Sequence, residues 1–499
     1  MHDSSRRPLI VNLVDKIALR DPPVGTRKQQ HPLRKPPNKH YTANDAGRAK
    51  RFVDRFQRDI RFVPERGSWL IWEAGRWRID QDGALERLAI KLSCDMLAEA
   101  TQIRGTDDGS AKQRAAACTE ALACGDRRNI VDFLGLAQVD RRILLPVSQL
   151  DSDPWMGAKN AVIELKTGTV REYSRDDYIT RTLGIEVDRQ ATCPRWEQFM
   201  EEVFPDAELR HYVHKALGYT LTGNTQEECF FFCHGSGRNG KSKTMTTVEH
   251  VFGGLWARAG KGIIAASSWR DYPIRELADI VGARFIIASE TKEDEQLNED
   301  VIKDLTGNDS LRAEHKYEKA FNFRAVGKLW IYGNHKPKIR GTDSAIWGRV
   351  RLIPFTEKFE GDRADHKLSE KLIAEAPGVL NWMVEGCLLW RKEGLRSPEI
   401  VRIAVADYRS EEDVLKDFVA QHIKDAPFAS VRHTEVYAHY QCWAQREGIT
   451  KSAFSSKGLA KRLRERGFRE GKDGRGDRTW VGVTLKDDLN EFTDETDET

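Results

Sequence analysis

The spacing of apolar residues along the chain first becomes regular after a proline-rich segment at the amino terminus. Residues 1–44 have no sustained periodicity and contain six of the seventeen prolines, which predicts a flexible arm. From Ala46 onward apolar residues recur at helical spacing. Pairs of short apolar runs around 69–79 and 161–173 flank glycine turns and predict hairpins. We therefore expect an α+β accessory domain over residues 45–195.

The next part of the chain alternates strands with helices. Residues 196–224 show the apolar spacing of amphipathic helices. Short, strongly apolar runs then predict buried strands, with helices between them, at 229–233, 284–290 and 328–334. Such alternation is typical of an α/β layered fold. The pattern predicts an α/β domain over residues 196–408.

The carboxyl-terminal part is mainly helical and ends in a turn-rich segment. Helical spacing covers 413–424, 434–447 and 454–466. The turn at 473–476 then separates two short runs that predict a two-stranded wing. This order of elements predicts a winged-helix domain over residues 409–485.

Composition narrows the class of protein. With 39% hydrophobic and 31% charged residues and a mean hydropathy of −0.59, the chain resembles ordinary globular proteins. No apolar run approaches the ~18 residues of a transmembrane helix, and the amino terminus lacks the apolar core of a signal peptide. We therefore expect a cytoplasmic protein with no membrane partner.

The net charge is only +3, but the charges are unevenly distributed. Residues 1–44 hold nine lysines and arginines against three aspartates, and residues 451–480 hold ten against four acids. Residues 486–499 hold one lysine against seven acids. Basic segments of this kind either contact nucleic-acid phosphates or are solvated, and both interpretations stay open. We expect a basic arm at one end and an acidic tail at the other.

The eight cysteines are scattered along the chain. The close pairs are Cys118 with Cys124 and Cys229 with Cys233, and neither has the two-residue spacing of a zinc site. We expect reduced thiols and no structural zinc.

The strongest chemical signal is the octapeptide Gly-Ser-Gly-Arg-Asn-Gly-Lys-Ser at 235–242, between an apolar run and a helix. In the Gly-x-x-x-x-Gly-Lys-Ser pattern, backbone amides cradle phosphates at a helix amino terminus. Lys241 would meet the β and γ oxygens and Ser242 would bind Mg²⁺. A plain glycine turn is the alternative. We expect ATP and Mg²⁺ as cofactors, with nucleotide contacts from Gly235, Gly237, Asn239, Gly240, Lys241, Ser242 and Lys243.

Polar residues after the next two predicted strands fit the hydrolysis of a bound nucleotide. Glu290 is the expected catalytic base and a second Mg²⁺ ligand, with the acids at 293–295 as alternatives. Asn334 would orient the attacking water, unless it caps the turn at Pro337. Arg349 is expected to stabilise γ-phosphate charge across a subunit boundary, although arginines that alternate along a strand can also face solvent.

These motifs resemble superfamily III helicases, in particular the phage and plasmid helicase-primase branch that includes the poxvirus replication ATPase. The resemblance implies an AAA+-type P-loop motor that forms a hexameric ring, moves 3′ to 5′ on single-stranded DNA and holds ATP between subunits. In this comparison Lys241 and Ser242 match the first ATP motif, Glu290 the second, Asn334 the sensor and Arg349 the arginine finger. The resemblance covers about residues 45–485 and rests on motifs at 235–242, 289–290, 305–313, 328–337 and 347–349.

The same resemblance assigns a DNA-gripping hairpin to residues 302–323. It implies phosphate contacts from Arg312, Lys316 and Lys319, and Tyr317 could stack on a base. A solvated hairpin tip is the alternative.

Two residues depart from the family pattern. Ser289 precedes Glu290 where many relatives have paired acids, which leaves open what else holds Mg²⁺. Lys243 stands where relatives often have threonine, and we expect that change to be mild.

In the predicted winged helix, basic residues gather on the expected recognition helix and on the wing. Lys461 represents the first group and Arg475 the second, and both would contact duplex DNA. A protein contact is the alternative.

Members of this branch often carry a primase domain, which needs carboxylates for two-metal chemistry. Asp151 and Asp153 have a suitable spacing, but their polar, proline-bounded stretch predicts a structural turn. We therefore expect a helicase portion without a primase domain, and a separate primase or polymerase as a partner.

These inferences predict an ATP-dependent replicative DNA helicase of a phage, plasmid or integrated mobile element. It would be a homo-oligomer, most simply a hexamer, that acts on single-stranded DNA and on forked or origin duplex DNA in the cytoplasm of a bacterial host. The alternatives are a bifunctional primase-helicase and an ATP-gated, origin-binding initiator that does not unwind DNA.

Overall fold

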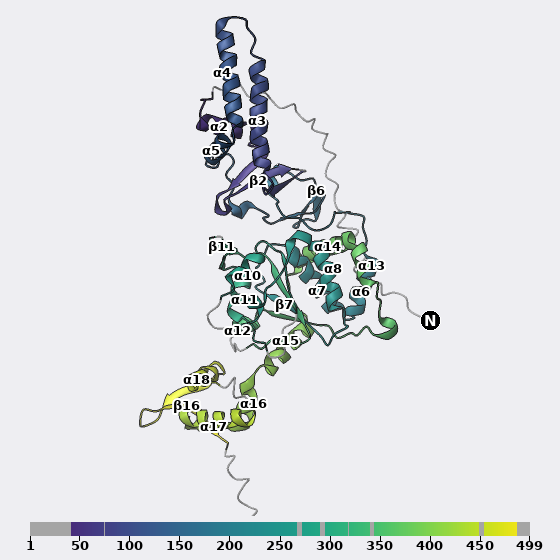
Figure 1. Ribbon diagram of the computed structural model, residues 1–499. Helices are drawn as coiled ribbons and strands as arrows, with labels where there is room; N and C mark the ends of the chain where they lie inside the picture. The colour runs from purple at the N-terminus through teal and green to yellow at the C-terminus, as the bar shows by residue number, and fades with distance from the viewer. Residues whose placement is uncertain are drawn as a thin grey trace, which may run out of the picture.

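The described chain forms an elongated particle (Figure 1). A helical hairpin projects at one end, a body built on a parallel sheet lies in the middle, and a small helix-and-sheet unit lies at the other end. The predicted mixed α/β fold with a parallel sheet is confirmed. The predicted arm and acidic tail lie almost entirely outside the described residues. The computed structural model describes residues 41–73, 75–266, 272–289, 295–317, 319–339, 344–448 and 454–486.

The amino-terminal unit packs helices against a small antiparallel sheet. Its first helix begins where the Asn44 side chain accepts a hydrogen bond from Gly47 N at 2.9 Å. The rings of Phe52, Phe56 and Phe133 meet in its core. The predicted first hairpin is confirmed, and one further strand extends it. The elements are α2 (Asp45–Phe56), β1 (Ile60–Val63), β2 (Ser68–Glu73), β3 (Arg76–Ile79), α3 (Ala84–Thr101), α4 (Asp108–Gly125) and α5 (Arg127–Ala137).

A second antiparallel sheet follows, and it packs onto the central body. Met156, Ile163 and Leu165 share one hydrophobic core with Trp196 and Phe231. The second predicted hairpin is confirmed, again with an added strand. The boundary predicted at residue 195 therefore falls inside a continuous core. The strands are β4 (Trp155–Gly157), β5 (Val162–Glu164) and β6 (Thr169–Arg171).

The central body is built on a parallel sheet of order β13-β7-β12-β9-β8. Phe231 of β7 faces one hydrophobic core, whereas Phe230 and Phe232 face the other. Because both faces are covered, β7 and β9 are apolar at successive positions, Phe230–Cys233 and Phe285–Ala288, rather than alternating. The strands are β7 (Phe230–His234), β8 (Trp256–Arg258), β9 (Phe285–Ser289), β12 (Lys328–Gly333) and β13 (Val350–Pro354).

Helices cover both faces of this sheet, and a hairpin extends from it (Figure 1). On one side α7 packs closely on α14. The approach leaves no room for a side chain at Gly218, where a Cβ would lie 2.1 Å from Cys387 N. The hairpin consists of β10 (Ser310–Ala313) and β11 (Phe321–Arg324). The helices are α6 (Pro194–Val203), α7 (Ala207–Leu221), α8 (Lys241–Phe252), α9 (Lys261–Ile264), α10 (Ile274–Asp279), α11 (Glu299–Thr306), α12 (Ser344–Trp347), α13 (Leu368–Ala374), α14 (Ala376–Glu393) and α15 (Glu399–Glu411).

Among the described residues, no single helix is long and apolar enough to cross a membrane. The bent pair α13 and α14 passes that test by length and composition only.

The carboxyl-terminal unit combines helices with the antiparallel sheet β14-β16-β15. The predicted helices and the hairpin around residues 473–476 are confirmed. A strand that the sequence did not predict, β14, pairs with β16, with a shift of register between Asp425 and Ser430. The elements are α16 (Val414–His422), β14 (Ile423–Arg432), α17 (His433–Arg446), α18 (Ser456–Glu465), β15 (Arg469–Lys472) and β16 (Arg478–Leu485).

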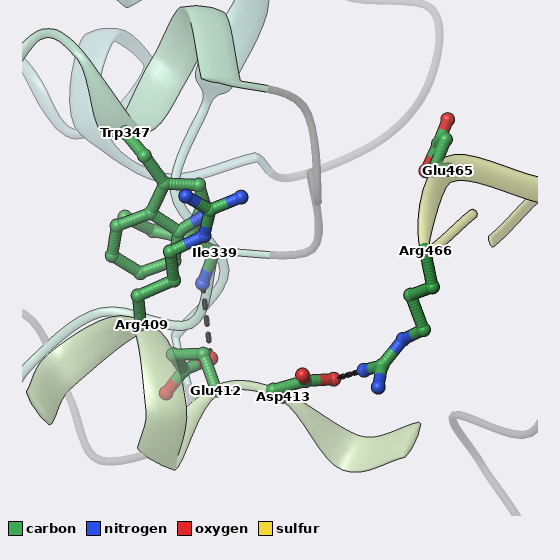
Figure 2. A pocket seen from close by; sticks show the side chains of 7 residues that line it. All are labelled: Ile339, Trp347, Arg409, Glu412, Asp413, Glu465 and Arg466. Carbon is green, nitrogen blue, oxygen red and sulfur yellow. Dashed lines mark hydrogen bonds and ion pairs between the residues drawn. The ribbon is translucent and has the colours of Figure 1, made fainter. Parts of the chain in front are cut away.

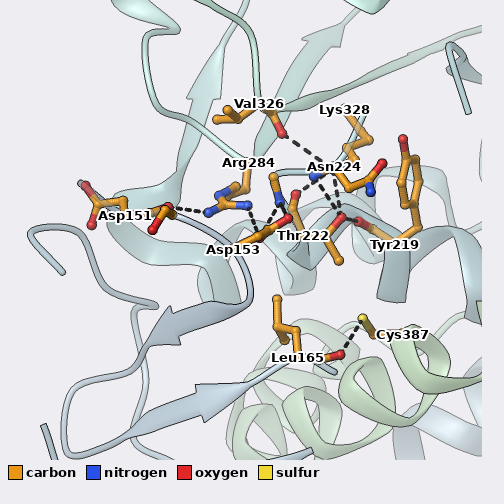
Figure 3. A network of polar contacts seen from close by, with 12 residues as sticks. Asp151, Asp153, Leu165, Tyr219, Thr222, Asn224, Arg284, Val326, Lys328 and Cys387 are labelled. Carbon is orange, nitrogen blue, oxygen red and sulfur yellow. Dashed lines mark hydrogen bonds and ion pairs between the residues drawn. The ribbon is translucent and has the colours of Figure 1, made fainter. Parts of the chain in front are cut away.

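A polar network, buried at Arg284 and Lys328 and partly exposed at Asp153, joins the second sheet to the amino edge of the central sheet (Figure 3). Arg284, whose side chain is 3% exposed, donates to Asp153 Oδ1 at 2.9 Å and to the Asp151 carbonyl oxygen at 2.6 Å. Asp153 also accepts from Gly223 N at 2.9 Å, and Asp151 Oδ2 accepts from Thr180 Oγ1 at 2.6 Å. Asp151 and Asp153 lie in a turn, as the sequence predicts.

Lys328 lies beside Arg284 in the same network (Figure 3). Its Nζ donates to Thr222 Oγ1 at 3.2 Å and sits 4.3 Å from the centre of the Tyr219 ring. Burial, and secondly the neighbouring Arg284 charge, lower the pKa of Lys328 well below its ordinary range. The carboxylate of Asp153 therefore supplies negative charge where two basic side chains are buried together.

We predict that Asp153→Asn lowers the free energy of unfolding by roughly 2 kcal/mol, a typical value for a hydrogen bond to a charged group, because the buried Arg284 guanidinium would lose its carboxylate partner. Urea unfolding followed by tryptophan fluorescence measures the change. The control is Asp132→Asn, whose carboxylate pairs with the exposed Arg128 at 3.9 Å and should contribute less than about 0.5 kcal/mol. Equal effects of the two substitutions would contradict the role of Asp153.

Candidate functional site

The glycine loop, residues 235–240, lies between β7 and α8, at the carboxyl edge of the parallel sheet. Gly237 and Gly240 have φ angles of 95° and 88°, which favour glycine and turn the backbone around the loop. Gly235 has no room for a side chain, because a Cβ there would lie 2.2 Å from Asn239 Nδ2 and 2.3 Å from the Phe355 carbonyl oxygen. A loop of this shape at a helix amino terminus suits a phosphate group.

Lys241 is the first residue of α8 and is 5% exposed. Its Nζ donates to the Gly235 carbonyl oxygen at 2.6 Å and to Asn334 Oδ1 at 3.1 Å. Burial lowers the pKa of Lys241 below its ordinary value. An anionic group beside it would therefore stabilise the charged amine.

Asn334 reaches Lys241 because of the strand register. It follows β12, which pairs with β7 in parallel so that Gly333 lies opposite His234. The residues that follow the two strands, Asn334 and Gly235, thus start from the same edge of the sheet. The structure brings together two of the predicted site residues, which are 93 positions apart in the sequence.

Ser242 and Lys243 occupy the first turn of α8 with different surroundings. Ser242 is exposed beside Lys241, and its hydroxyl is the kind of oxygen donor that Mg²⁺ accepts. The Lys243 side chain instead donates to Ser369 Oγ on α13 at 2.7 Å. Lys243 therefore ties the predicted nucleotide loop to a neighbouring helix.

The segment after β13 lies along the glycine loop, and the sequence did not predict this. Asn239 Nδ2 donates to the Phe355 carbonyl oxygen at 3.2 Å, and Phe359 N donates to the Arg238 carbonyl oxygen at 2.8 Å. Arg238 also pairs with Glu360 at 3.6 Å. These contacts link residues more than a hundred positions apart and leave no local signal in the sequence.

Glu290, the predicted base and metal ligand, lies outside the described residues, as do two of its alternatives at 293 and 294. The described residue nearest to it in the chain is Ser289, which ends β9 and pairs with Tyr332 of β12. The role of Glu290 stays a prediction.

Arg349 lies at the opposite edge of the sheet from the glycine loop. Val350 pairs with Phe230 and Pro354 with His234, so Arg349 precedes the amino end of β13. Its guanidinium donates to Thr306 Oγ1 at 3.1 Å and to Glu228 Oε2 at 3.1 Å. The side chain is 19% exposed. The structure does not bring Arg349 to Lys241 of the same chain.

The hairpin predicted to grip DNA is present as β10 and β11. Tyr317 lies in the connecting turn with a φ of 70° and is 92% exposed. Lys316 Nζ lies 4.9 Å from the centre of the Tyr317 ring. Arg312 is exposed on β10, opposite Asn322. Lys319 is also exposed, so the connecting turn presents basic side chains and an aromatic ring to solvent.

The two candidate contacts of the carboxyl-terminal unit are both at its surface. Lys461 on α18 is 71% exposed and lies 3.8 Å from Glu465. Arg475 lies in the turn between β15 and β16, where its backbone N donates to Asp473 Oδ1 at 2.9 Å. Neither side chain is buried in a way that would prevent contact with a partner.

Two family models match this chain. The model described as D5 N terminal like matches residues 49–205, and the model of a family of unknown function, DUF5906, matches residues 233–349. This pair of domains is found in D5-like helicase-primases, and together the two matches cover more than half of the chain. The chain belongs to the D5-like helicase-primases. The resemblance inferred from its motifs is confirmed, and the second match contains Lys241, Asn334 and Arg349.

Viral proteins are among the relatives of this D5-like chain. A protein of Acanthamoeba polyphaga mimivirus whose name describes it as a helicase is 30% identical over 55% of this chain and 31% of its own length. Primase D5 of fowlpox virus is 24% identical over 60% of this chain and 36% of its own length. The chain thus spans about a third of the length of these curated relatives.

Solved structures to which this chain is similar include the apo form of the NrS-1 C terminal region. It shares 9% sequence identity, over 85% of this chain and 96% of that one, with a TM-score of 0.46.

Proposed function

We propose that this D5-like protein is an ATP-dependent replicative DNA helicase of a phage, plasmid or integrated element, and that it works as a ring. The observation that carries the proposal is the contact between Lys241 Nζ and Asn334 Oδ1 at the carboxyl edge of the sheet, 3.1 Å long. It joins the lysine proposed to bind phosphate to a polar residue that directly follows the strand next to β7. That pairing suits an enzyme that hydrolyses a nucleoside triphosphate.

The strand order supports an AAA+-type motor. β12, which ends next to Asn334, lies between β7 with its glycine loop and β9. In the carboxyl-terminal unit, the order helix, strand, helix, helix and hairpin supports the predicted winged helix. We assign both folds on these grounds.

The nucleotide site that we propose uses the glycine loop, Lys241 and Asn334. The loop amides and Lys241 would bind the β and γ phosphates, and Asn334 would orient the attacking water. The exposed hydroxyl of Ser242 fits a ligand of Mg²⁺, which would neutralise charge on the phosphates when bound. Glu290 would complete the set as base and metal ligand.

The position of Arg349 supports a ring. β7 spans five residues, so the two edges of the sheet are separated by about 15 Å at 3.3 Å per residue. Arg349 at the amino edge cannot meet a phosphate bound at the carboxyl edge of its own chain. A neighbouring chain could present it there, as an arginine finger does.

The exposed hairpin supports contact with single-stranded DNA. Tyr317 offers an open ring face for a base, and Arg312, Lys316 and Lys319 offer charge for phosphates. In the winged helix, Lys461 and Arg475 would contact duplex DNA of the origin or fork. The helicase and primase names of the viral relatives support a role in replication.

Purified protein should hydrolyse ATP in the presence of single-stranded DNA and displace the strand of a forked duplex. We predict that Lys241→Ala abolishes both activities while leaving the far-UV circular dichroism unchanged, because the loop would lose its phosphate ligand. Lys91→Ala, on an exposed side chain of α3, is the control and should keep both activities. Hydrolysis by Lys241→Ala would show that the loop is misassigned.

The unsubstituted protein separates the alternative functions. ATP hydrolysis without strand displacement would favour the origin-binding initiator. Primer synthesis on a single-stranded template would favour the primase-helicase.

We predict that Arg349→Ala retains ATP binding but loses hydrolysis. Mixing inactive Arg349→Ala chains with inactive Lys241→Ala chains tests the subunit boundary, because some interfaces then combine an intact Lys241 with an intact Arg349. Recovery of hydrolysis in the mixture is the expected result. A mixture that stays inactive would refute action in trans.

We predict that Tyr317→Ala weakens binding to single-stranded DNA about tenfold, from the loss of one base-stacking contact, and leaves DNA-independent ATP hydrolysis unchanged. Fluorescence anisotropy with a labelled oligonucleotide measures the affinity. Phe428→Ala is the matched control, because Phe428 is also a fully exposed aromatic residue but lies in the carboxyl-terminal unit. Unchanged affinity of Tyr317→Ala would count against the hairpin as a DNA contact.

A further inference from the structure

The carboxyl end of α15 contacts both the loop that follows Asn334 and the short helix that precedes Arg349. We propose that Tyr408, on α15, is a positioning residue. It fixes the loop that follows Asn334, residues 335–339, relative to α12, the short helix that precedes Arg349. The inference rests on the proposed ATP hydrolysis. It adds a residue that touches neither nucleotide nor DNA.

Tyr408 binds the segment after Asn334 directly. Its hydroxyl donates to the carbonyl oxygen of Pro337, three residues after Asn334. Its ring also lies 5.3 Å from Lys336 Nζ. Tyr408 itself is 1% exposed, so water cannot replace a lost bond to the carbonyl without rearrangement of the segment.

Glu411 and Glu412, just after Tyr408 in the chain, also contact this loop. Lys336 Nζ forms an ion pair with Glu411. Ile339 N donates to Glu412 Oε2 at 3.1 Å. Residues 408–412 therefore hold the loop after Asn334 at successive points, and Lys338 N also donates to the Glu295 carbonyl oxygen at 2.8 Å. Of the side chains at 408–412 that contact this loop, Tyr408 is the buried one.

The same ring packs against the helix that leads to Arg349. Tyr408 and Trp347 meet edge to face, with ring centroids 5.2 Å apart and an angle of 81° between the rings. Trp347 is 6% exposed and ends α12. Arg349 N donates to the Ile346 carbonyl oxygen at 3.0 Å, which continues this turn up to the arginine. Tyr408 thus stands between the proposed sensor and the proposed finger.

The carboxyl end of α15 also faces the carboxyl-terminal unit (Figure 2). Asp413, two residues after the end of α15, forms an ion pair with Arg466 at the end of α18. Ile339, Trp347, Glu412 and Arg466 line a cavity of about 100 Å³ at this junction. Contacts of the sensor loop and of the Arg349 helix thus converge where the carboxyl-terminal unit joins the central body.

Loss of the Tyr408 hydroxyl should affect turnover more than nucleotide binding. The glycine loop is held by its own contacts to Phe355 and Phe359, which do not involve α15. Asn334, by contrast, leads directly into the loop that Tyr408 contacts at Pro337. A shift of that loop would misplace the amide that is proposed to orient the attacking water, while phosphate binding continues.

The test is steady-state ATP hydrolysis by Tyr408→Phe in the full chain. This substitution keeps the ring on Trp347 and removes only the hydrogen bond to Pro337. We expect kcat to fall at least fivefold, with KM for ATP within twofold of the unsubstituted protein. Circular dichroism and the melting temperature report on the fold.

Tyr440→Phe is the matched control. The Tyr440 hydroxyl also bonds to the backbone, accepting from Phe454 N at 3.1 Å, but it lies in the core of the carboxyl-terminal unit. It should leave kcat unchanged. The inference is overturned if Tyr408→Phe keeps its kcat while the unsubstituted protein is active, if only KM changes, or if Tyr440→Phe lowers kcat equally. An inactive unsubstituted protein would instead reject the proposed function itself.

Discussion

The parallel pairing of β7 with β12 on one side and β13 on the other is the constraint on which the rest of the site depends. One register places Gly333 beside His234, and the loops that follow bring Asn334 to Lys241. The other register places Val350 beside Phe230 and so sends Arg349 to the opposite edge. The pairing of β7 with its two neighbours therefore both brings Asn334 to Lys241 and places Arg349 at the other edge of the sheet.

The two edges of the central sheet solve opposite electrostatic problems. At the amino edge, Arg284 and Lys328 are buried with Asp153 as the carboxylate beside them, and their hydrogen bonds are made within the protein. At the carboxyl edge, Lys241 has no carboxylate among its described hydrogen-bond partners. Its two partners, the Gly235 carbonyl oxygen and Asn334 Oδ1, are neutral oxygens. At the amino edge Arg284 and Lys328 thus find their polar partners within the protein, whereas at the carboxyl edge Lys241 is a cation that an anionic ligand would stabilise.

Local patterns predicted the elements that carry their own signal. The run Phe230–Phe232 is apolar because both faces of the sheet are covered, and the glycine loop follows it directly. β14 was missed because it contains Pro427 and its register shifts there, so no alternation survives. Side-chain partners were beyond reach for a different reason. Tyr408 has the sequence context of an ordinary amphipathic helix, and only the fold shows that its hydroxyl meets Pro337.

The contacts of Arg349 within its own chain are compatible with the contact to a neighbouring chain that we propose. Thr306 and the Ala345 carbonyl oxygen fix its position through neutral hydrogen bonds. Its charged partner, Glu228, is 56% exposed, and an ion pair of this kind contributes at most about 1 kcal/mol. A triphosphate carries more negative charge than one carboxylate, so exchanging Glu228 for a phosphate at a subunit boundary would cost little. The half-exposed Glu228 therefore orients Arg349 in the single chain without preventing the contact that we propose for the ring.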